Sequence, residues 1–234
     1  FVNALENVRD GAFLPLLAKI DDICGEEKIS SFLKKHDIPV FFKDAAYHAA
    51  AEYDLPVPGS TELLPETVRL GVNPRYRGKH LSGLLRHEFC HIQQSFARLG
   101  LPPHPVSPLD MLWFLRVIEA DAESYNALCL FKLKLSGDGE LFDYRCWCGG
   151  YSRIYRAIKK QYKKDPSSLN DGRLRRTAFD AWFPHGWFSR DSIQVQYEMH
   201  ALAIHSTLKD MWGQKWIETP PDRCGYNRHR RLGW

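Results

Sequence analysis

RHEFCHIQQ (residues 86–94) is the stretch of this sequence that decides its interpretation. His87 and His91 stand four residues apart, and Glu88 directly follows the first histidine. A helix turns about 100° per residue, so the two imidazoles lie about 40° apart on one face. The apolar residues of the same segment form a stripe on nearly the opposite side: Leu85, Phe89, Ile92 and Phe96. We therefore expect a helix over about residues 80–99, with the histidines turned away from its core-facing stripe.

Two imidazoles at this spacing can both reach one metal ion, and zinc accepts imidazole nitrogen in tetrahedral sites. Glu88 would lie beside that ion without binding it, where a carboxylate can hold and deprotonate a bound water. His-Glu-x-x-His on a helix is for this reason typical of zinc-dependent hydrolysis. The alternative is a solvated helix face with two incidental histidines, and a third ligand would decide between the two.

Candidates for the third ligand lie in RVIEADAESYNAL (residues 116–128), which supplies Glu119, Asp121 and Glu123. Glu119 and Glu123 wind to about 40° apart, and the alanines around them let a neighbouring helix come close. This favours Glu119 as the ligand and Glu123 as the carboxylate that orients a ligating histidine. Asp121 projects well away from Glu119 and is either a buried acceptor or the wrong candidate, so the choice among the three acids stays open.

Residues 65–130 resemble the zincin metallopeptidases. They are closest to the gluzincin branch, in which His-Glu-x-x-His is followed by a glutamate on the next long helix. The residues that carry this resemblance are Glu119, Ala122, Glu123 and Tyr125. The chain is also similar to uncharacterised bacterial proteins described as metallopeptidases, which share an Asn-Pro strand end, a motif helix ending in Gln and an EADA helix. The resemblance implies an edge strand above the motif helix that pairs with extended substrate, and residues 67–72 stand in the right place for it.

The resemblance also implies a downstream Tyr or His that stabilises the oxyanion. Tyr197 and His200 share one face of a predicted helix, and they are the candidates for this role. A tyrosine hydroxyl and an imidazole satisfied inside a core explain the same pattern. Weaker candidates are His205, Tyr144 and His185. Cys90, between the histidines, is interpreted as a packing thiol.

The predicted fold class is α+β and zincin-like, with a small N-terminal sheet, an edge strand over the motif helix and a mostly helical C-terminal half. The 234 residues fit a single domain with an N-terminal helical segment (1–36), a motif-bearing core (37–135) and a helical C-terminal part (136–234). Ser107 or Asp110 is expected to cap the long second helix of the core. The expected elements are strands at 38–44 and 67–74 and helices at 80–99, 107–135, 151–164, 173–183 and 191–212. Residues 2–36 are also expected to be helical, with interruptions near Gly11 and Gly25.

Composition narrows the function classes only a little. The net charge is +4, and the excess of basic residues is local, at residues 158–164, 173–176 and 228–231. Solvated helix faces explain these runs, and attraction to nucleic acid is the functional alternative. No run of eighteen apolar residues is present, so no transmembrane helix is expected. The six cysteines, with CWC at 146–148, show no disulfide framework and are expected to be free thiols in a reducing compartment.

The sequence thus predicts a peptidase with one Zn²⁺ per chain, held by His87, His91 and Glu119, with Glu88 as the general base and a protein or peptide as substrate. A binding or regulatory protein on the same fold, without peptidase activity, is the alternative, although nucleic acid is not the expected partner. No signal peptide is visible, which suggests the cytoplasm or a translocated effector. Phe1 in place of Met leaves a trimmed leader open.

Overall fold

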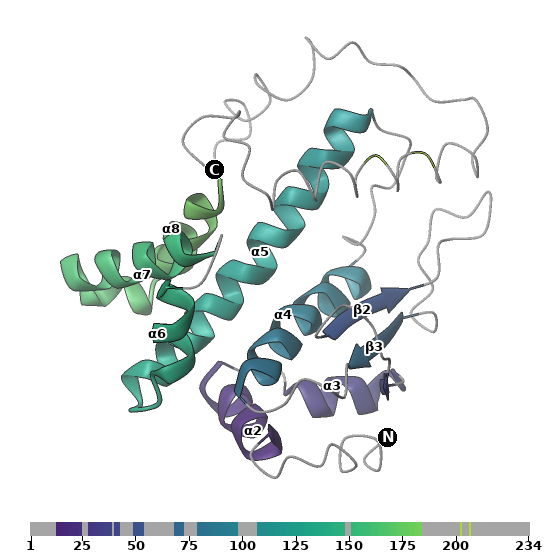
Figure 1. The fold of residues 1–234 in the computed structure, drawn as a ribbon, viewed down its shortest axis with the longest axis horizontal. Coiled ribbons are helices and arrows are strands. Elements are labelled where there is room, and N and C mark those ends of the chain that lie inside the picture. Colours follow the sequence, from purple (N-terminus) through teal and green to yellow (C-terminus); the bar gives the residue numbers. More distant parts are fainter. Residues whose placement is uncertain are drawn as a thin grey trace.

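The part of the chain that the structure describes is mostly helical (Figure 1). This computed structural model describes residues 13–24, 28–38, 40–42, 49–53, 68–72, 79–97, 107–147, 151–183, 202 and 206. Its helices are α2 (Phe13–Cys24), α3 (Ile29–Lys35), α4 (Lys79–Phe96), α5 (Pro108–Leu135), α6 (Glu140–Trp147), α7 (Ser152–Lys164) and α8 (Arg173–Trp182), with a 3-10 turn, η2, at Pro166–Leu169. Its strands are β1 (Val40–Phe42), β2 (Ala49–Tyr53) and β3 (Val68–Val72).

The three strands form one small sheet in the order β1-β3-β2. β3 runs parallel to β1, with Val40 opposite Leu70, and antiparallel to β2, with Tyr53 opposite Val68. Helix α4 packs against both β2 and β3, so the sheet lies directly beside the motif helix (Figure 1).

The predicted fold class, α+β, is wrong, because helices dominate the described residues and the strands are three to five residues long. The prediction of an edge strand at residues 67–72 is also wrong. That segment forms β3, which has a neighbour on each side and is therefore the central strand. Strand β2 was not predicted, because its sequence, AAAEY, is poor in the β-branched and aromatic residues that mark a strand.

Helix α5 is the longest described element and joins the two sides of the molecule. Ser107 begins it, since its side-chain oxygen accepts a hydrogen bond from the backbone N–H of Asp110 at 3.1 Å, and Pro108 occupies the first turn. Of the two predicted caps, Ser107 is thus the one that the structure uses. Figure 1 shows α4 and the sheet on one side of α5 and helices α6, α7 and α8 on the other, as their contacts require.

The main core lies on the α6–α8 side of α5. Its largest buried side chains interdigitate across four helices: Phe131, Phe142, Tyr155, Ile158, Leu174 and Trp182. Phe142 of α6 sits 5.1 Å from Phe131 of α5 and 5.3 Å from Tyr155 of α7, measured between ring centroids. This packing fixes α7 against the middle of α5, next to the carboxylates that the sequence singled out.

The other predicted helices meet mixed outcomes. Those at 80–99, 151–164 and 173–183 are confirmed as α4, α7 and α8, and the described part of 2–36 divides into α2 and α3. Helix α6 was missed, because eight residues are too few to show a helical period. The predicted helix at 191–212 lies outside the described residues, apart from 202 and 206. Among the described helices, none combines the length and the apolar character that a membrane span needs.

Candidate metal centre

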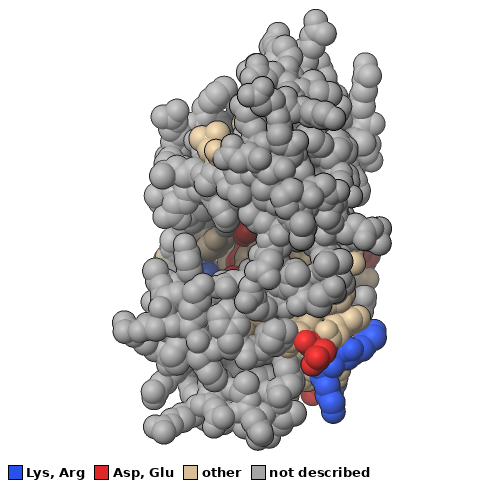
Figure 2. Space-filling model, turned by 90° about the vertical axis from the view of Figure 1, so that its right-hand side faces the viewer, with Lys and Arg blue, Asp and Glu red and all other residues tan. Residues whose placement is uncertain are grey.

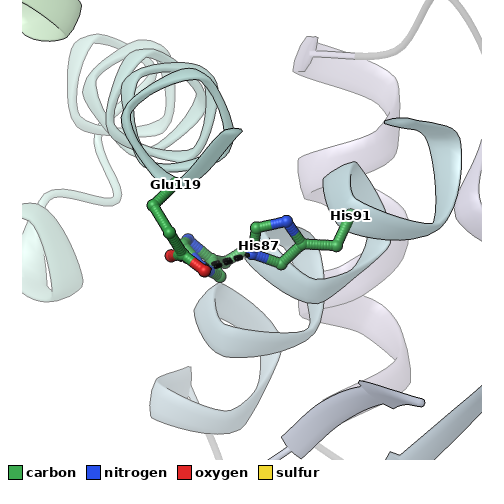
Figure 3. Close-up of side chains that lie close together, drawn as sticks. All are labelled: His87, His91 and Glu119. Atoms are coloured by element: carbon green, nitrogen blue, oxygen red, sulfur yellow. Dashed lines mark hydrogen bonds and ion pairs between the residues drawn. The ribbon is translucent and has the colours of Figure 1, made fainter. Parts of the chain in front are cut away.

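Three side chains from two helices meet at one point of the structure (Figure 3). His87 and His91 come from α4, and Glu119 reaches them from α5. The two Nε2 atoms lie 3.1 Å apart, and each is 3.3 Å from an oxygen of Glu119. Within the described residues, this is the only group of three or more His, Cys, Asp or Glu side chains arranged closely enough to hold a metal ion.

The spacing of these atoms fits a tetrahedral zinc site. With bonds of about 2.0–2.1 Å, the corners of a tetrahedron lie about 3.3–3.4 Å apart. The 3.1 Å between the two Nε2 atoms is close to this edge length. The two contacts of Glu119 involve different oxygens, since Oε2 lies 3.3 Å from Nε2 of His87 and Oε1 lies 3.3 Å from Nε2 of His91. Two imidazole nitrogens and one carboxylate oxygen are also a donor set that zinc accepts, and three protein ligands leave a fourth position for water or substrate.

Glu123 fixes which nitrogen of His87 is available to a metal. Its Oε2 lies 2.9 Å from Nδ1 of His87, and a carboxylate can only accept, so Nδ1 carries the hydrogen. The neutral ring then presents its lone pair at Nε2, which is the atom that faces Glu119. The other oxygen of Glu123 accepts a hydrogen bond from the hydroxyl of Tyr155 at 2.7 Å.

Gln94 does the same for His91. Its Oε1 lies 2.9 Å from Nδ1 of His91, while its Nε2 donates to the carbonyl of Ile118 at 3.0 Å and to Asp121 at 3.1 Å. Those two acceptors determine the orientation of the amide, so its oxygen has to face the imidazole. His91 therefore also carries its hydrogen on Nδ1 and turns Nε2 to the shared point.

Asp121 faces away from the histidines. Its second carboxylate oxygen pairs with Arg175 of α8 at 2.6 Å, and about two fifths of its side chain is exposed. Of the three acids considered from the sequence, Glu119 alone stands within reach of both Nε2 atoms, while Glu123 contacts His87 and Asp121 contacts Gln94.

The acids and imidazoles of this site shift one another's pKa values. Burial alone would lower the pKa of His87, but its hydrogen bonds to Glu119 and Glu123 raise that pKa well above its usual value. The pKa of His91 is also raised, because the charge of Glu119 outweighs the effect of burial. Burial would raise the pKa of Glu119, yet the two histidines hold it far below its usual range. A divalent ion would replace the protons held here.

Of the other site residues predicted from the sequence, the structure describes some and not others. Glu88 lies on α4, half-buried, and its charge contributes to the raised pKa of His91. Tyr197 and His200 lie outside the described residues, as do two of the weaker candidates, His185 and His205.

Two further side-chain predictions fall on described residues. Tyr144 is exposed on α6. Cys90 is a free, buried thiol whose pKa is raised by burial, as expected of a packing residue. Cys129 and Cys146 are free and buried as well.

Sequence reasoning missed the roles of Gln94 and Tyr155. Gln94 had a detectable signal, because it follows His91 by three residues and so lies on the same helix face. Tyr155 had none, since it belongs to a helix 32 positions beyond Glu123, and only the packing of α7 on α5 brings its hydroxyl to the carboxylate.

Arginines of the basic run in α8 pair with acidic side chains. In α8, Arg173 pairs with Asp165 and Asp171, and Arg176 pairs with Asp180. Part of the positive charge of α8 is thus balanced within the chain. Figure 2 shows the opposite side of the molecule, the right-hand side of Figure 1, where described Lys or Arg side chains at the lower right also have acidic side chains beside them.

Comparison with known proteins finds one family. The model of the family described as "Putative metallopeptidase family (DUF6782)" matches residues 52–211, which include α4, α5, α7 and α8. Neither a curated protein nor a solved structure matches the chain.

Proposed function

Because the chain belongs to this metallopeptidase family, we propose that it hydrolyses peptide bonds with one zinc ion held by His87, His91 and Glu119. The observation that carries the proposal is the convergence of both Nε2 atoms, 3.1 Å apart, with the Glu119 carboxylate, whose two oxygens each lie 3.3 Å from one of them. The family assignment supports a metal and a protein or peptide substrate. The donor set supports zinc as that metal.

Zinc bound at this centre would supply a Lewis acid and lower the pKa of a coordinated water to about 7. Glu88 follows His87 directly and is only half-buried, so its carboxylate can face the open side of the site. In the proposed reaction, Glu88 accepts a proton from the attacking water and returns it to the departing amine. Glu123 and Gln94 hold the two imidazoles in the tautomer that the site requires.

Stabilisation of the oxyanion needs a further donor in this scheme. Tyr197 and His200 stay the predicted candidates from the sequence. We propose no second function, because the arginines of α8 are engaged in ion pairs and nothing else in the described residues favours a nucleic-acid partner.

The substitution Glu88→Gln tests the proposal, because it removes the base and keeps the size of the side chain. Cleavage of a mixed peptide library, followed by mass spectrometry, should fall by about 10²–10⁴-fold, while bound zinc stays near one per chain. Glu140→Gln, the same change on the exposed first turn of α6, is the matched control and should cleave as the wild type does. Unchanged cleavage by the Glu88→Gln protein, or no cleavage by zinc-loaded wild type, would contradict the proposal.

A further inference from the structure

A tyrosine of α7 contacts the candidate metal centre indirectly, through the carboxylate of Glu123. The side chain of Tyr155 is fully buried, and its hydroxyl donates to Oε1 of Glu123 at 2.7 Å. Glu123 is itself only 2% exposed, and its other oxygen is the one that faces Nδ1 of His87 at 2.9 Å. A chain of two hydrogen bonds therefore connects α7, through α5, to a histidine of α4.

Glu123 depends on such donors to stay charged and in place. A buried carboxylate loses its hydration, and it keeps its charge only where hydrogen bonds and nearby positive charge replace the water. Besides His87 and Tyr155, the side chain of Asn126 donates to Oε2, at the longer distance of 3.4 Å. Tyr155 is the only donor to Oε1 among the described hydrogen bonds of this carboxylate, so it sets which oxygen is left for the imidazole.

The position of Tyr155 is set by packing on helices other than the motif helix. Its ring stands edge-on to Phe142 of α6, with 5.3 Å between the centroids, inside the core beside α5. Burial and the charge of Glu123 raise the pKa of the hydroxyl well above its usual value, so it stays protonated and donates. The donor thus belongs to the main hydrophobic core of the described chain.

We propose that Tyr155 is a positioning residue of the metal centre, which holds Glu123 so that His87 presents Nε2 to the ion. This inference rests on the proposed function, since it requires that His87 bind a metal. It extends the site to α7, a helix that supplies no candidate ligand. Tyr155 acts through Glu123 and has no contact with the substrate.

The substitution Tyr155→Phe tests this role, because it keeps the buried ring and removes only the hydroxyl. We expect the dissociation constant for zinc, measured by competition with a chromophoric chelator, to rise by about 10-fold, at the lower end of the 10–100-fold range for such supporting residues. The absorption bands of the Co²⁺-substituted protein should shift as well, because the geometry around the ion changes. Tyr162→Phe removes a hydroxyl from the same helix, where the ring packs on Phe131, and should change neither quantity.

A double-mutant cycle separates positioning from packing. If Tyr155 acts through Glu123, Tyr155→Phe should alter zinc affinity by less than about twofold in a Glu123→Ala background. That background contains no buried carboxylate to leave unpaired, so the double variant remains measurable even if Tyr155→Phe alone folds poorly. Equal effects of Tyr155→Phe in both backgrounds, or an unchanged affinity in Tyr155→Phe itself, would overturn the inference.

Metal binding by the wild-type protein distinguishes failure of the proposed function from failure of the proposed role of Tyr155. Wild type that binds zinc, together with a Tyr155→Phe variant of the same affinity, counts against the role of Tyr155 alone. Wild type that binds neither Zn²⁺ nor Co²⁺ overturns the proposed function and this inference with it.

Discussion

At the scale of single residues, the centre is defined by the partners of its histidines as much as by the histidines themselves. His87 and His91 each have Nδ1 bound to an acceptor, Glu123 for the first and Gln94 for the second. Both rings therefore turn Nε2 to the same point, held there by protein partners. A site whose ligands are already oriented loses less conformational freedom when it binds its ion.

Gln94 offers a direct test at this scale, because the preceding residue, also a glutamine, is its natural control. Gln94→Ala removes the acceptor at Nδ1 of His91 and leaves that ring free to rotate, so zinc affinity should fall about 10-fold or more. Gln93→Ala removes a half-buried glutamine one position away and should leave the affinity unchanged. Chelator competition on both proteins measures the difference, and equal affinities would show that Gln94 does not orient His91.

The residues of the site were accessible to sequence reasoning to different degrees. The shared face of the histidine pair follows from helical periodicity, because a helix places residues four apart on one face, and Glu119 was one of three candidate acids. The choice of Glu119 over Asp121 needed the structure, since only the packing of α4 on α5 shows which acid faces the histidines. Tyr155 could not be found, because its partner is remote in sequence.

At the scale of elements, one buried carboxylate joins three helices of the N-terminal half. Asp21 lies on α2, accepts a hydrogen bond from the backbone N–H of Ile29 at the start of α3 and lies 3.6 Å from the guanidinium of Arg86 on α4. Burial raises the pKa of Asp21 to about 6, although Arg86 and the N–H of Ile29 act in the opposite direction. Asp21 thus connects α4, the helix of the two histidines, to α2 and α3.

This raised pKa predicts how stability changes with pH. Between about pH 4 and 6 the folded chain holds a proton on Asp21 that the unfolded chain has released. The contribution of Asp21 to the free energy of unfolding is therefore full below about pH 4, and it is lost as the pH rises through 6. Two pKa units correspond to about 2–3 kcal/mol. In Asp21→Asn, denaturant unfolding of the metal-free protein should lose this part of the pH dependence.

A neighbouring aspartate is the control for that experiment. Asp22→Asn makes the same change on the exposed adjacent residue, which pairs with Lys28 at 3.0 Å and lies outside the buried group. If the pH profile of Asp21→Asn ran parallel to that of the wild type, the shift in the pKa of Asp21 would be wrong.

Elements with a clear period were predicted well, and those without one were not. The long amphipathic segments became α4, α5, α7 and α8 close to their expected bounds. Strand β2 and helix α6 were missed, because three alanines in a strand and an eight-residue helix have no periodic signal of their own. Their formation depends on neighbours, β3 for the first and α5 and α7 for the second.

At the scale of the whole molecule, helix α5 connects the candidate metal centre to the main core, because it contributes residues to both. One face of α5 presents Glu119 to α4, while its other faces pack on α6, α7 and α8. The fold class was predicted wrongly because the resemblance emphasised a sheet, whereas the described chain stabilises its centre mainly with helices. The histidines depend on this helical support, since the partners of Glu123 and Asp121 come from α7 and α8.

The metal content of purified protein, measured by elemental analysis after dialysis, tests the central claim most directly. We predict about one zinc per chain in the wild type, retained in Asp121→Ala and lost in both His91→Ala and Glu119→Ala, because only the latter two remove an atom from the group of three. A Glu119→Ala protein that keeps a full zinc ion, or a wild type that takes up none, would contradict the account.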